Sequence, residues 1–142
     1  MKKITILFAS ALTLGLSFAS CNKDDDSSSS SSSVSLEGKW NFSKEDIIVD
    51  GTEILVDYSG NESGCSKDYI MINTNGTITS VDYDSFDTPC EVFTDNGTWV
   101  RTGNSIAVTL GGETFTSEIL TLTSSEFKVK DADGEITVFT RG

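Results

Sequence analysis

Hydrophobic and polar residues alternate with a period of two over most of the chain from about residue 35 to residue 142. In residues 36–43, one face carries Leu36, Gly38, Trp40 and Phe42, while the intervening positions are polar or charged. This alternation is typical of a β-strand with one buried face. No segment keeps a helical period, so we expect an all-β domain of about eight to ten strands.

Residue pairs that favour tight turns separate the predicted strands. They are Asp50-Gly51, Asn75-Gly76, Gly103-Asn104, Gly111-Gly112 and Ser124-Ser125, with a further turn at 131–134. Short turns make successive strands antiparallel neighbours. Two irregular segments, 59–66 and 84–95, interrupt this meander, and we expect the second to be the longest loop. A meander of this length favours a closed antiparallel barrel over a sandwich, because closure removes exposed strand edges.

The first part of the chain has a different character. Two lysines precede a mostly apolar run that ends in small residues near position 20, which is the pattern of a secretory signal. That run is too short and too polar for a membrane-spanning helix of ~20 apolar residues. Residues 22–33 contain no apolar residue, which predicts a flexible tether. We therefore expect a signal peptide at 1–20, a tether at 21–34 and one domain at 35–142.

Residues 18–21, Phe-Ala-Ser-Cys, resemble the lipobox of bacterial lipoproteins. The resemblance implies cleavage before Cys21, whose sulfur would carry a diacylglyceryl group and hold the protein in a membrane. The acidic residues at 24–26 are also similar to the signal that sends many Bacteroidetes lipoproteins to the exterior of the outer membrane. A plain solvated spacer is the alternative for that acidic run.

Cys65 and Cys90 are the two cysteines that remain once Cys21 carries lipid. In an exported protein the surroundings favour oxidation, so we expect a disulfide between them. Two separate buried thiols are the alternative.

Composition excludes several classes of function. The net charge of −12 repels phosphate backbones, so we expect no nucleic-acid partner. The chain has no histidine, which removes imidazole-based catalysis and imidazole metal ligands. The acidic runs at 82–87 and 131–135 lack the pattern of a calcium-binding EF-hand loop. We expect neither an enzyme nor a bound cofactor or metal.

Several motifs occur in a characteristic order along residues 35–142. They are Leu-x-Gly-x-Trp at 36–40, Cys65, the Asn-Gly hairpin at 75–76, Cys90 and Gly-Thr-Trp at 97–99. This order resembles the lipocalin-like domains of Bacteroidetes lipoproteins and implies a lipocalin-like barrel. In lipocalins the first-strand Trp lies at the closed end beneath an Arg, which implies a barrel-closing pair of Trp40 and Arg141. An ordinary core aromatic is the alternative for Trp40.

The resemblance leaves two hypotheses for function. In the first, the barrel binds a small hydrophobic or amphipathic molecule. The residues expected to line its interior are Trp40, Phe42, Tyr69, Met71, Trp99 and Phe115. In the second, a barrel filled by its own side chains is an interaction module for glycan or protein partners at the cell surface. We expect a monomer in either case.

Overall fold

The computed structural model describes residues 34–142, which form nine antiparallel strands. The strands are β1 (Gly38–Val49), β2 (Thr52–Asp57), β3 (Tyr69–Ile72), β4 (Thr77–Asp84), β5 (Glu91–Thr102), β6 (Ser105–Leu110), β7 (Glu113–Leu122), β8 (Glu126–Lys130) and β9 (Ile136–Arg141). The predicted signal peptide, the lipid attachment at Cys21 and almost all of the predicted tether lie outside the described residues.

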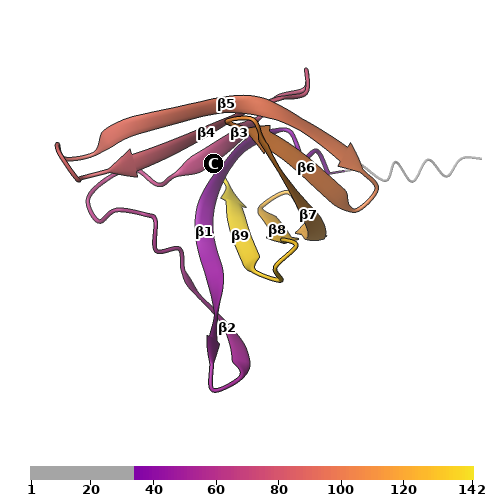
Figure 1. Ribbon diagram of the computed structural model, residues 1–142, viewed down its shortest axis with the longest axis horizontal. Coiled ribbons are helices and arrows are strands. Elements are labelled where there is room, and N and C mark those ends of the chain that lie inside the picture. The colour runs from indigo at the N-terminus through magenta and orange to yellow at the C-terminus, as the bar shows by residue number, and fades with distance from the viewer. Residues whose placement is uncertain (1–33) are drawn as a thin grey trace, which may run out of the picture. The chain divides into compact units, whose positions relative to one another are not determined.

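Eight of the strands close into a barrel, as the turn pattern predicted. From β3 to β9 each strand pairs with the next along the chain, and β1 pairs with both β3 and β9. Figure 1 shows β1 and β9 side by side where the ring closes. Closure leaves β2 outside the ring, paired only with β1. The all-β, closed antiparallel fold expected from the sequence is confirmed.

Strand β1 has three partners because it is much longer than the strands beside it. Its first residues, Gly38 to Asn41, pair with β3, and its last, Lys44 to Val49, pair with β2. Its other edge pairs with β9, with a bulge between Phe42 and Lys44. A bulge adds one residue to one strand, so the side chains beyond it change faces. Phe42 therefore faces inward with Phe139, and so does Glu45 after the bulge.

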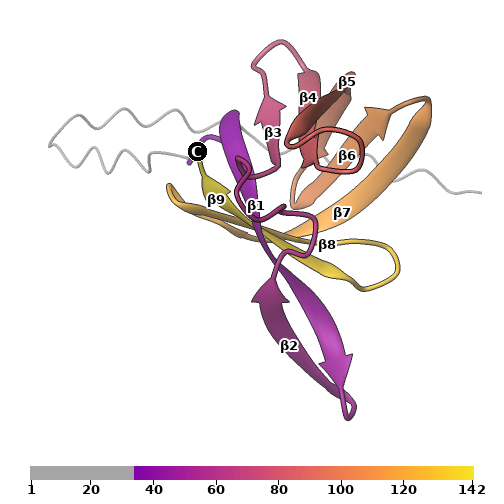
Figure 2. The same cartoon turned by 90° about the vertical axis from the view of Figure 1, so that its left-hand side faces the viewer.

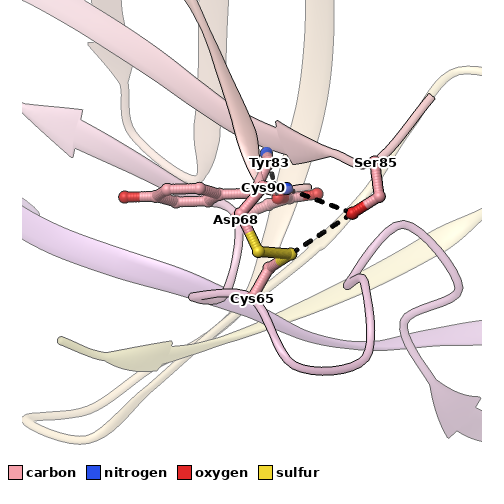
Figure 3. The surroundings of a disulfide bond; sticks show 5 residues. All are labelled: Cys65, Asp68, Tyr83, Ser85 and Cys90. Carbon is pink, nitrogen blue, oxygen red and sulfur yellow. Dashed lines mark hydrogen bonds between the residues drawn. A yellow bond between two sulfur atoms is a disulfide. The ribbon is translucent and has the colours of Figure 1, made fainter. Parts of the chain in front are cut away.

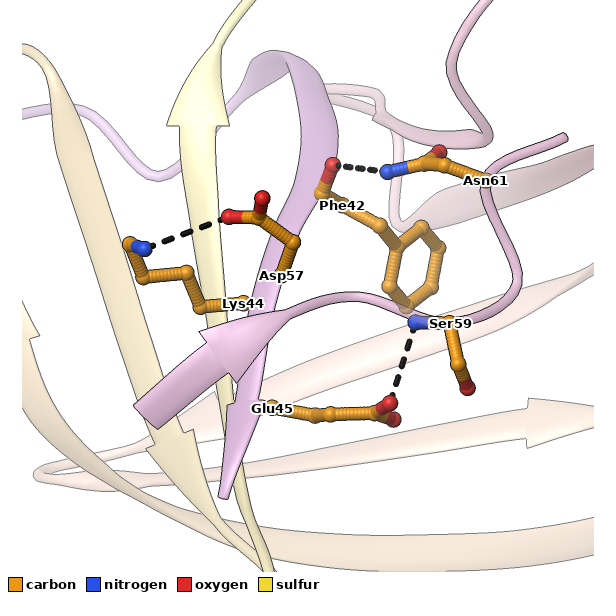
Figure 4. A network of polar contacts seen from close by, with 6 residues as sticks. All are labelled: Phe42, Lys44, Glu45, Asp57, Ser59 and Asn61. Carbon is orange, nitrogen blue, oxygen red and sulfur yellow. Dashed lines mark hydrogen bonds and ion pairs between the residues drawn. The ribbon is translucent and has the colours of Figure 1, made fainter. Parts of the chain in front are cut away.

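The β1–β2 hairpin projects away from the barrel, as Figure 2 shows. The chain then returns to β3 through residues 58–68, which fill the wall where β1 has left β3. Side chains replace the missing strand contacts there: Asn61 Nδ2 donates to the Phe42 carbonyl at 3.0 Å (Figure 4). Asp68 Oδ1 accepts the Tyr83 amide at 2.8 Å. The return segment is thus hydrogen-bonded to both β1 and β4.

A disulfide joins Cys65 in this return segment to Cys90, immediately before β5 (Figure 3). The predicted pairing is present, and it ties the 58–68 segment to the β4–β5 turn. The expectation that 84–95 is the longest loop is wrong. β5 already begins at Glu91, leaving only residues 85–90 as the turn, so the 58–68 segment is the longer connection. Residues 91–95 are mostly exposed and polar, which hid their pairing with β4 from the hydrophobic pattern.

The core follows the predicted inward positions of most strands. Ile78, Ile106, Ile119 and Phe127 are almost wholly buried and pack in one cluster with Trp40. Gly97 is required where β5 meets β6, since a Cβ there would lie 1.8 Å from the Thr109 carbonyl oxygen. The strands therefore approach more closely than any other residue type would allow at this position.

Candidate functional site

The barrel contains a partly open cavity of about 390 Å³ between its inward-facing side chains. Its apolar lining residues are Phe42, Ile70, Ile78, Ile106, Val108, Leu110, Phe115, Phe127, Val129 and Phe139. Four polar residues complete the wall: Ser80, Ser117, Thr137 and Asp131. Apolar walls with a few placed polar groups are the usual make-up of a small-molecule site, and the volume lies within the range of about 300–1,000 Å³ for such sites.

The cavity continues toward the surface beside the β8–β9 turn. Strand β8 pairs with β7 only from Glu118 onward, so the first half of β7 has no partner on that edge. Two further hollows, of about 500 and 160 Å³, lie between this half of β7 and the turn. Asp131 lines both hollows and the cavity itself. The two hollows and the cavity therefore adjoin on this side of the barrel, at Asp131.

The opposite end of the barrel is closed around Trp40, which has no exposed surface. Its indole nitrogen donates to the Leu36 carbonyl at 2.7 Å. The Arg141 guanidinium lies 3.8 Å from the centre of the Trp40 ring, so the predicted pair is in contact. Arg141 also donates to the carbonyls of Glu37 and Ser35, both at 2.8 Å. One side chain thus joins the first described residues to the last strand.

Two of the six residues predicted to line a ligand site, Phe42 and Phe115, line the cavity. Phe115 is 55% exposed and lies where the cavity approaches the surface. The prediction is wrong for Tyr69 and Met71, since Ile70 and Ile72 are the buried residues of β3. The Lys39 ammonium lies over the Tyr69 ring at 3.9 Å, on the outer face of the barrel.

The two tryptophans face inward but lie outside the cavity lining. Trp40 fills the closed end, as described above. Trp99 is partly buried against the core, and its indole nitrogen donates to the Asn73 carbonyl at 2.9 Å. Both rings therefore help to close the barrel near its turns, and neither borders the cavity.

Several lining residues were missed because they are small or polar. Asp131 was assigned only to a turn, although it follows Phe127 and Val129 at period two, which places it on the same inner face. Ser80 follows the inward Ile78 in the same way on β4. Strand alternation continued past the last apolar residue would have found both.

A second polar region borders the cavity beside Phe42. The Tyr58 ring stacks on Phe42 with centroids 4.6 Å apart. Burial raises the pKa of the Tyr58 hydroxyl, and the nearby carboxylates of Asp68, Asp82 and Glu45 raise it further. Burial also raises the pKa of Asp82, with a smaller contribution from Asp68. Acidic groups thus collect where the return segment meets the barrel.

The polar groups on the two faces of the hairpin base are kept apart. Lys44 and Asp57 form an ion pair at 3.3 Å on the outer face, and both side chains are well exposed. Glu45 turns to the other face and accepts the Ser59 amide at 3.0 Å (Figure 4). The lysine is therefore directed away from the cavity, whereas the glutamate is directed toward Tyr58.

Residues 34–142 contain no grouping of three or more acidic or cysteine side chains arranged to hold a metal ion. Within the same residues, no helix has the length and apolar character that a membrane span needs.

Comparison with known proteins identifies the family. The model of the lipocalin-like domain family matches residues 36–129. The chain belongs to this family. A lipocalin-like protein from Bacteroides uniformis has a similar structure, with a TM-score of 0.57 and 16% identity over 75% of this chain and 98% of that one.

A second solved structure, an uncharacterized protein from Bacteroides eggerthii, is also similar. Its TM-score is 0.56, with 13% identity over 76% of this chain and all of the other. At these identities the two structures support the lipocalin-like fold alone. No curated protein matches the chain.

Proposed function

We propose that this lipocalin-like protein is a membrane-anchored surface lipoprotein that binds a small hydrophobic or amphipathic molecule inside its barrel. The observation that carries the proposal is the cavity of about 390 Å³, lined by aliphatic and aromatic side chains. A filled barrel, the alternative for function, would use these same side chains to occupy the interior. The cavity and its continuation beside the β8–β9 turn favour a binding role over a filled interaction module.

The anchoring part of the proposal rests on the residues before the barrel. A lipid on Cys21 would hold the protein, because each buried methylene contributes ~0.8 kcal/mol and two or more acyl chains are needed for stable attachment. The polar residues at 22–33 would then keep the acidic barrel away from the headgroups. The acidic run at 24–26 supports a position on the outer face of the outer membrane. In this proposal the protein is a monomer without enzymatic activity.

A neutral solvatochromic dye, Nile red, tests ligand binding. We expect it to bind the domain at one site with a blue-shifted emission and to be displaced by long-chain alcohols. Val108→Phe adds a ring to the cavity wall and should abolish binding. Val100→Phe makes the same change at an exposed position of β5 and should leave binding unchanged. Equal binding by both variants would contradict a site inside the barrel.

The anchor is tested in cells of the producing organism. The protein should take up labelled fatty acid and enter the membrane fraction, and the Cys21→Ser variant should do neither. Protease added to intact cells should digest the barrel if it faces the exterior. Lipid uptake by the Cys21→Ser variant, or complete protection from protease in a membrane-bound protein, would contradict the corresponding part of the proposal.

A further inference from the structure

The charged side chain in the wall of the cavity is acidic. Asp131 is the charged residue in its wall, and no lysine or arginine of the described residues lines it. The Asp131 Oδ1 atom accepts the amides of Asp133 and Glu135, each at 2.9 Å. These two bonds hold the carboxylate in place at the point where the cavity meets both outer hollows. A molecule entering by this side must pass a fixed negative charge.

Inward-facing carboxylates continue around the same end of the barrel. Ser80 lines the cavity and lies directly opposite Asp95 across β4 and β5. Asp82 follows Ser80 on the inner face of β4. Glu45, after the bulge of β1, shares the inner face with Thr137 of β9, another lining residue. Each of the strands β1, β4 and β5 thus brings an acidic side chain to the open end.

Four basic residues of the barrel lie outside the cavity wall. Lys44 is paired with Asp57 on the outer face, and Lys39 lies over Tyr69 on the outside of β3. Arg141 is at the closed end over Trp40. Lys130 borders one of the outer hollows but not the cavity. Within the part of the chain that the structure describes, no lysine or arginine lines the cavity itself, and Lys130 shares only an outer hollow with Asp131.

From this arrangement we infer that the cavity selects amphiphiles with a cationic head group, accepts neutral ones less well and rejects anionic ones such as fatty acids. The apolar tail would occupy the barrel between Phe42, Val108 and Phe139, and the head group would lie beside Asp131. Like charges placed together cost binding free energy, while an opposite charge adds to it and speeds association. This inference rests on the proposed binding function and adds the chemical class of the ligand.

The test compares ligands of one chain length and different charge. Decyltrimethylammonium, decanol and decanoate compete with Nile red below their micelle-forming concentrations, at low and at high salt. We expect the cation to displace the dye at concentrations at least about tenfold lower than decanoate, with decanol between them. High salt should narrow the difference, because these carboxylates are partly exposed to solvent.

Variants separate a local charge at the site from the overall charge of the protein. Asp131→Asn keeps the side-chain oxygen that accepts the two turn amides but removes the charge. It should reduce the preference for the cation by about threefold or more. Glu126→Gln removes one charge at the start of β8, near the closed end, and should preserve the preference.

The possible failures are distinguishable. If Nile red and all three amphiphiles fail to bind, the proposed binding function and the proposed ligand class are both wrong. If the dye binds and is displaced, but decanoate competes as well as the cation, the binding function stands and the charge selection is wrong. An equal loss of preference in Asp131→Asn and Glu126→Gln would also overturn the role given to Asp131.

Discussion

Replacing Arg141 by Met removes the guanidinium at the closed end of the barrel while keeping an unbranched side chain of similar reach. Arg141 lies 3.8 Å from the Trp40 ring centre and donates to two carbonyl groups that precede β1. A cation over an aromatic ring contributes ~0.5–2 kcal/mol, according to its exposure. Each hydrogen bond adds a net ~1 kcal/mol. Since Arg141 is only partly buried, we expect a loss of about 2–4 kcal/mol in the free energy of unfolding.

Urea unfolding measures this loss directly, with far-UV circular dichroism and tryptophan fluorescence recorded on the same samples. Trp40 should also change its native emission, because it has no exposed surface while the arginine covers it. Arg101→Met is the matched control. Its Nε donates only to the carbonyl of Gly103 in the adjacent turn, so its loss should stay within about 0.5 kcal/mol. Equal losses in the two variants, or no change in Trp40 emission, would refute the account of the closed end.

Three further predictions concern other parts of the barrel. Burial raises the pKa of Asp68 above its ordinary value of 3.8, more than the hydrogen bond from the Tyr83 amide lowers it. The folded state then binds the proton more tightly than the unfolded chain, so this group's contribution to stability is present at acid pH and is lost as pH rises through the raised pKa. Asp68→Asn keeps a side-chain oxygen that can accept the hydrogen bond from the Tyr83 amide. The free energy of unfolding of this variant at pH 7 should equal or exceed that of the wild type. A clear decrease in that free energy would contradict the prediction. Replacing Cys65 and Cys90 by Ser should cost about 3 kcal/mol on the chain-entropy model, and a reductant should destabilise the wild type but not the variant. Gly97→Ala forces a methyl group into a carbonyl oxygen of β6 and should cost about 2 kcal/mol or more in thermal or urea unfolding, whereas a stability equal to wild type would show that the strands can separate there.

The overall fold was predictable because short residue pairs in the sequence determine where the tight turns lie. Pairs such as Asn75-Gly76 and Gly111-Gly112 favour tight reversals, and short reversals leave few ways to arrange the strands. The inward face of β8 was equally clear, because Phe127 and Val129 alternate with charged residues and are both buried. The fold was therefore predictable wherever the turn residues and the alternation of apolar with polar residues matched the observed turns and buried positions.

The site was harder to predict for two physical reasons. Residues 69–72 are all apolar, so their hydrophobicity alone cannot show which of Tyr69 and Ile70 faces inward. The bulge after Phe42 shifts β1 by one residue, which depends on its pairing with β9 and so on contacts far apart in sequence. Polar lining residues such as Asp131 carry no hydrophobic signal, although they are the groups that would orient a ligand.

The contacts of Arg141 also determine how the domain would respond to mechanical load. Any pull transmitted along the chain that precedes residue 34 enters the barrel beside Ser35 and Glu37, whose carbonyls Arg141 holds from β9. Beyond them, the same pull meets β1 where it is bonded along both edges, to β3 and to β9. A force applied at this end must therefore break the hydrogen bonds from Arg141 to Ser35 and Glu37 before it can separate β1 from its neighbouring strands. The closed end is thus the mechanically more resistant end of the domain.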